Sequence, residues 1–189
     1  MFLDYHYFAP HVYGGTMERE NHPVWAVYDK LRTARLNVRY YSERLRRLEL
    51  LDKAMDLALV IAAPTSAVAG LWFFKTDIGK HVWQGLGTVS AFIAAIRPAI
   101  QFRKTLKTYE MTIVSYQALE YDLETIRRKV EQRGVYDEEL KADFLRALER
   151  QRHIDISSPD KIANSRLLKT CTTAVLSEMP SSAFFIPER

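Results

Sequence analysis

The residues that most often carry metal or nucleophilic chemistry are few and scattered in this chain. None of the five histidines stands in an HExxH or comparable ligand spacing. The single cysteine, Cys171, has no evident histidine partner in the sequence, so we expect a buried small residue rather than a nucleophile. The sequence therefore predicts no catalytic site, no metal site and no enzymatic activity.

Glycine patterns point away from nucleotide chemistry as well. Gly85 and Gly87 lie in an apolar segment and lack the third glycine and the preceding strand of a dinucleotide-binding fingerprint. The sequence contains no GxxxxGK[ST] phosphate loop. Its basic residues accompany no DNA- or RNA-binding motif. We therefore expect no cofactor and no direct contact with nucleic acid.

The most informative polar residues lie inside two long apolar segments. If these segments cross a bilayer, the side chains either line a water-filled path in an oligomer or form hydrogen bonds between neighbouring helices. A single pair of helices encloses no pore, so conduction requires several copies around an axis. The candidate pore-lining residues are Thr65, Ser66, Gln84, Thr88 and Ser90.

Composition limits the class of protein. The chain has 189 residues, of which 48% are hydrophobic, with seven glycines and seven prolines, which excludes a collagen-like or wholly disordered chain. One cysteine cannot form an intramolecular disulfide, which excludes a small disulfide-rich scaffold. The formal net charge is +4.

The two apolar segments predict a transmembrane hairpin. Residues 57–74 form 18 positions without a charge, which as an α-helix would measure roughly 27 Å, close to the ~30 Å of a bilayer core. A short connection leads to residues 82–102, in which the only charge is Arg97. The short connection favours two antiparallel membrane helices. The alternative is a pair of alanine-rich core helices in a soluble all-α protein.

Small residues recur every four positions in both segments. Such stripes allow close approach of helix backbones in lipid. The predicted packing residues are Ala58, Ala62, Ser66 and Gly70 in the first segment, and Gly87, Ala91, Ala95 and Ala99 in the second.

Basic residues flank the hairpin more densely than its loop, which has only Lys75 and Lys80. By the positive-inside rule, both termini are expected to be cytoplasmic. The flanking bases are candidates for contact with anionic lipid headgroups, and a solvated helix face explains them equally well. They are Arg39, Arg44, Arg46, Arg47, Lys53, Arg97, Arg103 and Lys104.

Long amphipathic helices are predicted on both sides of the hairpin. Apolar residues follow three- and four-residue steps, which is typical of a coiled-coil seam. They are Val27, Leu31, Ala34, Val38, Tyr41, Leu45 and Leu48 before the hairpin, and Phe102, Leu106, Tyr109, Ile113, Tyr116, Leu119, Leu123, Ile126 and Val130 after it. The two seams can pair with each other or with other subunits.

Capping signals predict two further helices. Asp137 is a candidate N-cap after the helix-ending Gly134, and Ser158 with Pro159 and Asp160 marks another helix start. Residues 179–189 and 1–23 have no periodicity and are expected to be mobile or docked on partners. The predicted parts are thus an aromatic-rich N-terminal tail (1–23), a two-transmembrane helical domain (24–152) and a C-terminal helix with its tail (153–189).

The order of these elements resembles a known family. A basic helix containing YDKLRTARLNVRYYSERLRRLELLDKAMD, two closely spaced apolar helices, and FRKTLKTYEMTIVSYQALEYDLETIRR together resemble the SLATT family, the SMODS- and SLOG-associating two-transmembrane effector domains of bacterial conflict systems. The resemblance covers roughly residues 24–152. It rests on architecture and on the style of the tyrosine- and arginine-rich helices, and no separate nucleotide-binding domain is visible in the sequence.

The resemblance implies an antiphage effector in the bacterial inner membrane. Such a protein would form a homo-oligomeric pore or membrane-disrupting assembly and cause abortive infection. Its trigger would be a cyclic nucleotide or a partner sensor protein. The competing hypothesis is a passive membrane-anchored coiled-coil scaffold that recruits cytoplasmic partners.

Overall fold

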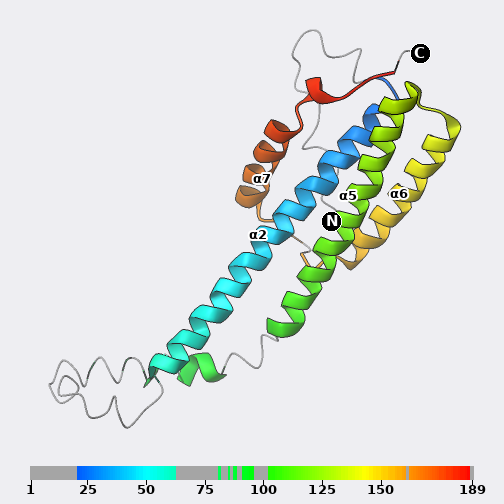
Figure 1. The fold of residues 1–189 in the computed structure, drawn as a ribbon. Coiled ribbons are helices and arrows are strands. Elements are labelled where there is room, and N and C mark those ends of the chain that lie inside the picture. The colour runs from blue at the N-terminus through cyan, green and yellow to red at the C-terminus, as the bar shows by residue number, and fades with distance from the viewer. Residues whose placement is uncertain are drawn as a thin grey trace. The chain divides into compact units, whose positions relative to one another are not determined.

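The computed structural model describes residues 21–62, 81, 85, 87–88, 91–95, 102–160 and 162–187. The chain is all-α, and no strand occurs among these residues (Figure 1). Its helices are α2 (Trp25–Ala62), α5 (Phe102–Arg133), α6 (Glu138–Ser157), α7 (Ser165–Glu178) and the 3-10 turn η2 (Ser181–Ala183). The all-α prediction is therefore confirmed.

The chain divides into two compact units. Residues 1–43 and 108–189 form the first unit, and residues 44–107 form the second. In the first unit α7 lies against α2, and α6 lies against α5 (Figure 1).

Helices α2 and α5 pair antiparallel in the first unit. The Arg35 guanidinium lies 2.6 Å from the Glu120 carboxylate, and further along α2 the Tyr41 ring stacks on Tyr116, with 5.7 Å between ring centroids. The residue numbers of the contacts on α5 fall as those on α2 rise, which is the order expected for antiparallel helices. The parts of the predicted seams that lie in the first unit therefore pair with each other within one chain.

The core of the first unit contains large aromatic and aliphatic side chains. Helices α6 and α7 cover the α2–α5 pair with apolar faces. The largest fully buried side chains are Tyr28, Tyr40, Tyr41, Tyr116, Leu31, Leu119, Leu123, Leu140, Val24, Val27, Val130 and Val175. Cys171 is also buried, as predicted.

One pair of helix ends follows the sequence prediction. Helix α5 ends before Gly134, whose φ of 69° is a left-handed conformation that glycine adopts without steric cost. Asp137 then caps α6, because its carboxylate accepts a hydrogen bond of 2.9 Å from the backbone N–H of Leu140.

The predicted helix start at Ser158, Pro159 and Asp160 is wrong. Ser158 is instead the C-cap of α6, and α7 begins at Ser165, with Asn164 as the N-cap that accepts from the Leu167 backbone N–H at 3.0 Å. The reason is tertiary. The Ser158 hydroxyl and the Asp160 carboxylate bond to tyrosines of α2 and α5 rather than to a following helical turn.

Residues 179–187 were predicted to be mobile or docked on a partner. In the structure they pack on α2 of the same chain, with the Phe184 ring buried against Tyr28. Periodicity gives no signal for such a segment, because much of its attachment is through main-chain carbonyl groups.

The second unit contains the end of α2 and the start of α5, around the expected hairpin. The apolar side chains of Leu50, Leu51, Leu57, Val60 and Phe92 are exposed. Among the described residues, no helix combines the length and the apolar character needed to cross a bilayer. Residues 63–80 and most of 82–101, and so the larger part of both expected spans, lie outside the described residues.

The predicted packing stripes fall largely outside the description as well. The Ala58 side chain is half-buried, and Gly87, Ala91 and Ala95 are exposed. The side chain of Ala62 and residues Ser66, Gly70 and Ala99 lie outside the described residues. Close packing of these two stripes therefore stays a prediction.

Candidate functional site

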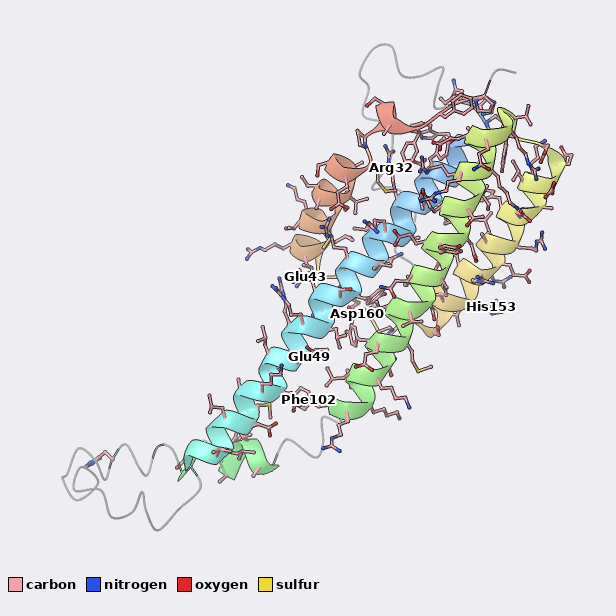
Figure 2. The ribbon with its side chains drawn as sticks, in the orientation of Figure 1. Arg32, Glu43, Glu49, Phe102, His153 and Asp160 are labelled. Atoms are coloured by element: carbon pink, nitrogen blue, oxygen red, sulfur yellow. The ribbon has the colours of Figure 1, made fainter. Side chains whose placement is uncertain are left out.

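Two hydrogen-bonded networks stand out in the first unit, and the first joins four tyrosines to the α6–α7 connection. We call Tyr40, Tyr41, Tyr109 and Tyr116 the tyrosine cluster. The hydroxyl of Tyr40 donates to Asp160 Oδ2 at 3.0 Å, and the hydroxyl of Tyr109 donates to Asp160 Oδ1. Asp160 is labelled in Figure 2. One carboxylate is thereby bound to both α2 and α5.

The same cluster also binds the last turn of α6, its C-cap and the N-cap of α7. The Tyr116 hydroxyl donates to Asp155 Oδ1 at 2.5 Å, and the hydroxyls of Tyr41 and Ser158 share a hydrogen bond. The backbone N–H of Asn164, the N-cap of α7, donates to the Tyr40 hydroxyl at 3.0 Å. The position of α7 is therefore linked to the α2–α5 pair.

Burial keeps these phenols protonated. Removal from water raises the pKa of Tyr41 to about 12. Burial, and then the negative charge of Asp155, raise the pKa of Tyr116 well above its usual value. Both phenols are therefore neutral at physiological pH, and Tyr116 donates to Asp155 in this state.

The second network lies on one face of α2. Trp25, Tyr28, Arg32, Arg35 and Arg39 follow each other at three- and four-residue steps and so share one stripe of the helix. We call these five residues the seat, and residues 179–187, which pack on it, the strap.

The centre of the seat is a buried arginine. The Arg32 side chain is only 4% exposed, and its Nε and Nη2 donate to the Met179 carbonyl at 3.0 and 2.7 Å. Nη2 also donates to Ser181 Oγ at 3.2 Å. The guanidinium carbon lies 4.9 Å from the Phe184 ring centroid, a cation–π distance.

The aromatic end of the seat holds the strap by one ring and one carbonyl. Phe184 stacks on Tyr28, with centroids 4.4 Å apart, and meets Trp25 edge-on at 5.9 Å. The Tyr28 hydroxyl donates to the Phe185 carbonyl at 2.5 Å. Burial, followed by the charge of Glu131, raises the pKa of Tyr28 to about 12.

The basic end of the seat binds the last residue of α7. Glu178 lies 2.8 Å from Arg39 and 3.6 Å from Arg35, and Arg35 also pairs with Glu120. Arg39 was one of the residues predicted to contact lipid headgroups. Any such contact competes with Glu178 in this arrangement.

The remaining predicted site residues are not brought together with these networks. Arg44 is half-buried, and Arg46, Arg47, Lys53, Arg103 and Lys104 are exposed. Thr88, a candidate pore-lining residue, is exposed. Thr65, Ser66, Gln84, Ser90 and Arg97 lie outside the described residues. Their proposed contacts with water or lipid stay predictions.

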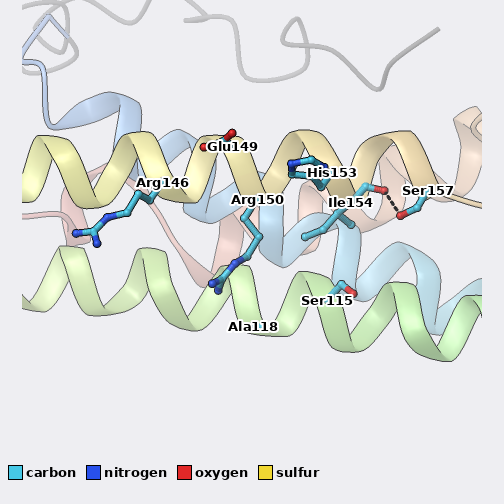
Figure 3. A pocket seen from close by; sticks show the side chains of 8 residues that line it. All are labelled: Ser115, Ala118, Arg146, Glu149, Arg150, His153, Ile154 and Ser157. Atoms are coloured by element: carbon cyan, nitrogen blue, oxygen red, sulfur yellow. Dashed lines mark hydrogen bonds between the residues drawn. The ribbon is translucent and has the colours of Figure 1, made fainter.

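A shallow groove of about 550 Å³ lies between α5 and α6 (Figure 3). It is lined by Ser115, Ala118, Arg146, Glu149, Arg150, His153, Ile154 and Ser157. Its arginines already face carboxylates, since Arg146 pairs with Asp143 and Arg150 with Asp122. These pairs balance the charge of the groove, so it offers no concentrated field for an anionic ligand.

Metal chemistry finds no support in the described part of the chain. No group of three or more histidine, cysteine, aspartate or glutamate side chains there is arranged to hold a metal ion.

Sequence reasoning missed both networks. The cluster tyrosines of the two seams were identified only as apolar positions. Of the three arginines of the seat, only Arg39 was singled out, as a candidate contact of lipid headgroups. The regular spacing of Arg32, Arg35 and Arg39 was the available signal that they share a face. Their partners lie more than 80 residues away, beyond the reach of local patterns.

Comparison of the chain with protein-family models, with curated proteins and with solved structures finds no match.

Proposed function

We propose that this chain is a two-pass membrane effector of the SLATT type, with both termini in the bacterial cytoplasm. On activation by a partner sensor protein or a cyclic nucleotide, it would assemble into a homo-oligomeric pore or membrane-disrupting structure and cause abortive infection. The charge-free segment 57–74 and the nearly charge-free segment 82–102 are the sequence basis of the proposal.

One structural observation carries the proposal. Helix α2 continues without a break into the first apolar segment, and there its apolar side chains are exposed: Leu57 by 60% and Val60 by 71%. Exposed apolar side chains in a contiguous patch are typical of a surface that contacts lipid or protein.

The first unit supplies a means of control. Helices α2 and α5 lead into and out of the expected hairpin, and in the first unit they are tied together by the α6–α7 connection through Asp160. A ligand that binds two arrangements of this unit with different affinity would shift the equilibrium between a silent and an active assembly. A single hairpin encloses no pore, so the active form requires several copies.

Membrane potential and dye entry in bacteria that express the chain, alone and with its neighbouring genes, test the proposal. The informative variant is Val68→Arg, which puts a charge near the middle of the first span at a cost of about 2.5–3.5 kcal/mol for insertion. Its matched control is Val135→Arg, at a valine outside both expected spans that is 48% exposed.

We expect depolarisation with the native chain and with Val135→Arg, and none with Val68→Arg. We also expect the native protein to stay in membranes after high-salt and carbonate washing. Release from membranes by these washes would refute the two-pass proposal. The effector function would be refuted by an abundant protein that resists these washes but never changes membrane potential or dye exclusion under any co-expression or infection. The scaffold function would then be the remaining explanation.

The scaffold function is favoured by a different observation. Met111, Val114 and Tyr121 of α5 are exposed at steps of three and seven residues and form an apolar stripe. In a passive membrane-anchored scaffold this stripe would recruit a cytoplasmic partner. Tyr121→Asp would then abolish recruitment, whereas replacing Ser66, Gln84 or Thr88 by leucine would have little effect. In a pore, those leucine substitutions would alter toxicity or ion selectivity.

A further inference from the structure

The seat has the composition of a surface that binds an extended peptide. It presents the exposed Arg35 and the half-buried Arg39 for a carboxylate, a buried arginine and a tyrosine hydroxyl that donate to main-chain carbonyls, and two rings that enclose a third. The chain's own Glu178 and strap occupy it. We propose that the seat is a peptide-binding surface, and that a partner segment with a carboxylate six positions before an aromatic residue displaces Glu178 and the strap.

Few groups of the strap provide its attachment. The seat recognises the Glu178 carboxylate, the Phe184 ring and the main-chain carbonyls of Met179 and Phe185. Carbonyl recognition is independent of side-chain identity, as in other modes of binding to extended peptides. The sequence requirement therefore reduces to an acidic residue and, six positions later, an aromatic one.

The other side chains of the strap differ in burial. Pro187 is buried and Met179 and Ile186 are half-buried, whereas the side chains of Ser182, Ala183 and Phe185 are exposed. Within the strap, backbone hydrogen bonds run from the N–H of Ala183 to the Pro180 carbonyl and from the N–H of Phe184 to the Ser181 carbonyl. Binding energy concentrated in one ring and one guanidinium is typical of a hot spot, and a competitor that supplies the same groups can replace the strap.

The intramolecular connection sets the threshold for displacement. A tethered segment competes at an effective concentration that reaches the millimolar range for short links. A free peptide therefore binds the native chain weakly, and it binds well once the internal ring has been removed. This inference does not depend on the membrane function, because both partners lie within the first unit.

The test uses the full chain in detergent and a fluorescein-labelled peptide with the sequence of residues 177–187, SEMPSSAFFIP. Fluorescence anisotropy measures its binding to the native chain, to Phe184→Ala and to the matched control Phe185→Ala, whose ring is exposed. We expect Phe184→Ala to bind the peptide at least about tenfold more tightly than the native chain. Phe185→Ala should behave as the native chain.

Peptides with alanine in place of the Phe184 ring, or with glutamine in place of the Glu178 carboxylate, should lose binding to Phe184→Ala. Hydrogen exchange of the Phe184 and Phe185 amides measures release of the strap in each chain variant. If Phe184→Ala fails to fold, as judged by circular dichroism, Phe184→Leu replaces it.

Two results would overturn the inference. One is faster amide hydrogen exchange in Phe184→Ala, which shows that the strap is released, without tighter peptide binding than the native chain. The other is equal peptide binding by the native chain and the variant, which would place the peptide elsewhere on the molecule.

Discussion

Tyr40 and Asp160, which are 120 positions apart in the chain, are joined by a hydrogen bond of 3.0 Å. The same carboxylate accepts from Tyr109, and the Tyr40 hydroxyl accepts from the backbone of Asn164. Helices α2 and α5 therefore meet at one acidic side chain, and the start of α7 is bound to one of the two tyrosines at this junction. Asp160 thus joins parts of the first unit that lie far apart in the chain.

Replacing Asp160 by asparagine should destabilise the first unit by about 1–3 kcal/mol. The asparagine side chain has only one oxygen to accept from the two tyrosines. Its NH₂ group would face the other tyrosine hydroxyl, which is also a donor. Chemical denaturation followed by circular dichroism measures the change. The control is Asp122→Asn, which breaks a largely exposed pair with Arg150 and should cost no more than about 1 kcal/mol. Equal effects of the two variants would refute a special role for Asp160.

Alkaline pH should destabilise the first unit through its buried phenols. The pKa values of Tyr28 and Tyr41 rise from 10.0 in a free side chain to about 12 in the folded state. A raised folded pKa means that the contribution to stability is complete below about pH 10 and is lost as the pH rises towards 12. Melting temperatures between pH 8 and 12 should fall over that interval.

The Tyr41→Phe variant should show a shallower loss of melting temperature over the same interval, because one of the phenols with a raised pKa is gone. Tyr121→Phe, at an exposed tyrosine of α5, should retain the native slope. An alkaline transition that is as steep in Tyr41→Phe as in the native chain would contradict the assignment.

Leu123→Ala should cost about 2–5 kcal/mol of folding free energy, because a fully buried leucine leaves a cavity where α5 packs in the core. Leu145→Ala, at an exposed leucine of α6, should change stability by less than about 0.5 kcal/mol. Thermal or urea unfolding distinguishes the two, and similar losses would mean that Leu145 is covered by a partner in solution.

Gly134→Ala should destabilise the α5–α6 connection by about 1–2 kcal/mol, because a side chain at a φ of 69° meets the following carbonyl group. Open space around the glycine means that the cost is one of backbone conformation rather than of collision with a neighbour. Gly134→Asn should cost less, since asparagine tolerates the left-handed region better than alanine. An alanine variant as stable as the asparagine variant would contradict this explanation.

The elements that could be predicted from the sequence are those with local causes. Three- and four-residue apolar steps gave the paired faces of α2 and α5, because one side of each helix must be buried against the other. The end of α5 at Gly134 and the start of α6 at Asp137 follow from the conformation of one residue and from one side chain capping its own helix.

Tertiary structure decided what the polar residues do. Ser158 and Asp160 have the residue types of a helix start, yet distant tyrosines bind their oxygens, and α7 begins seven residues after Ser158, at Ser165. The strap has no periodicity, and Arg32 gives it a fixed place by binding a carbonyl 147 positions away. Sequence spacing determines which residues share a helix face, whereas contacts of this length depend on how the helices pack, which no local pattern contains.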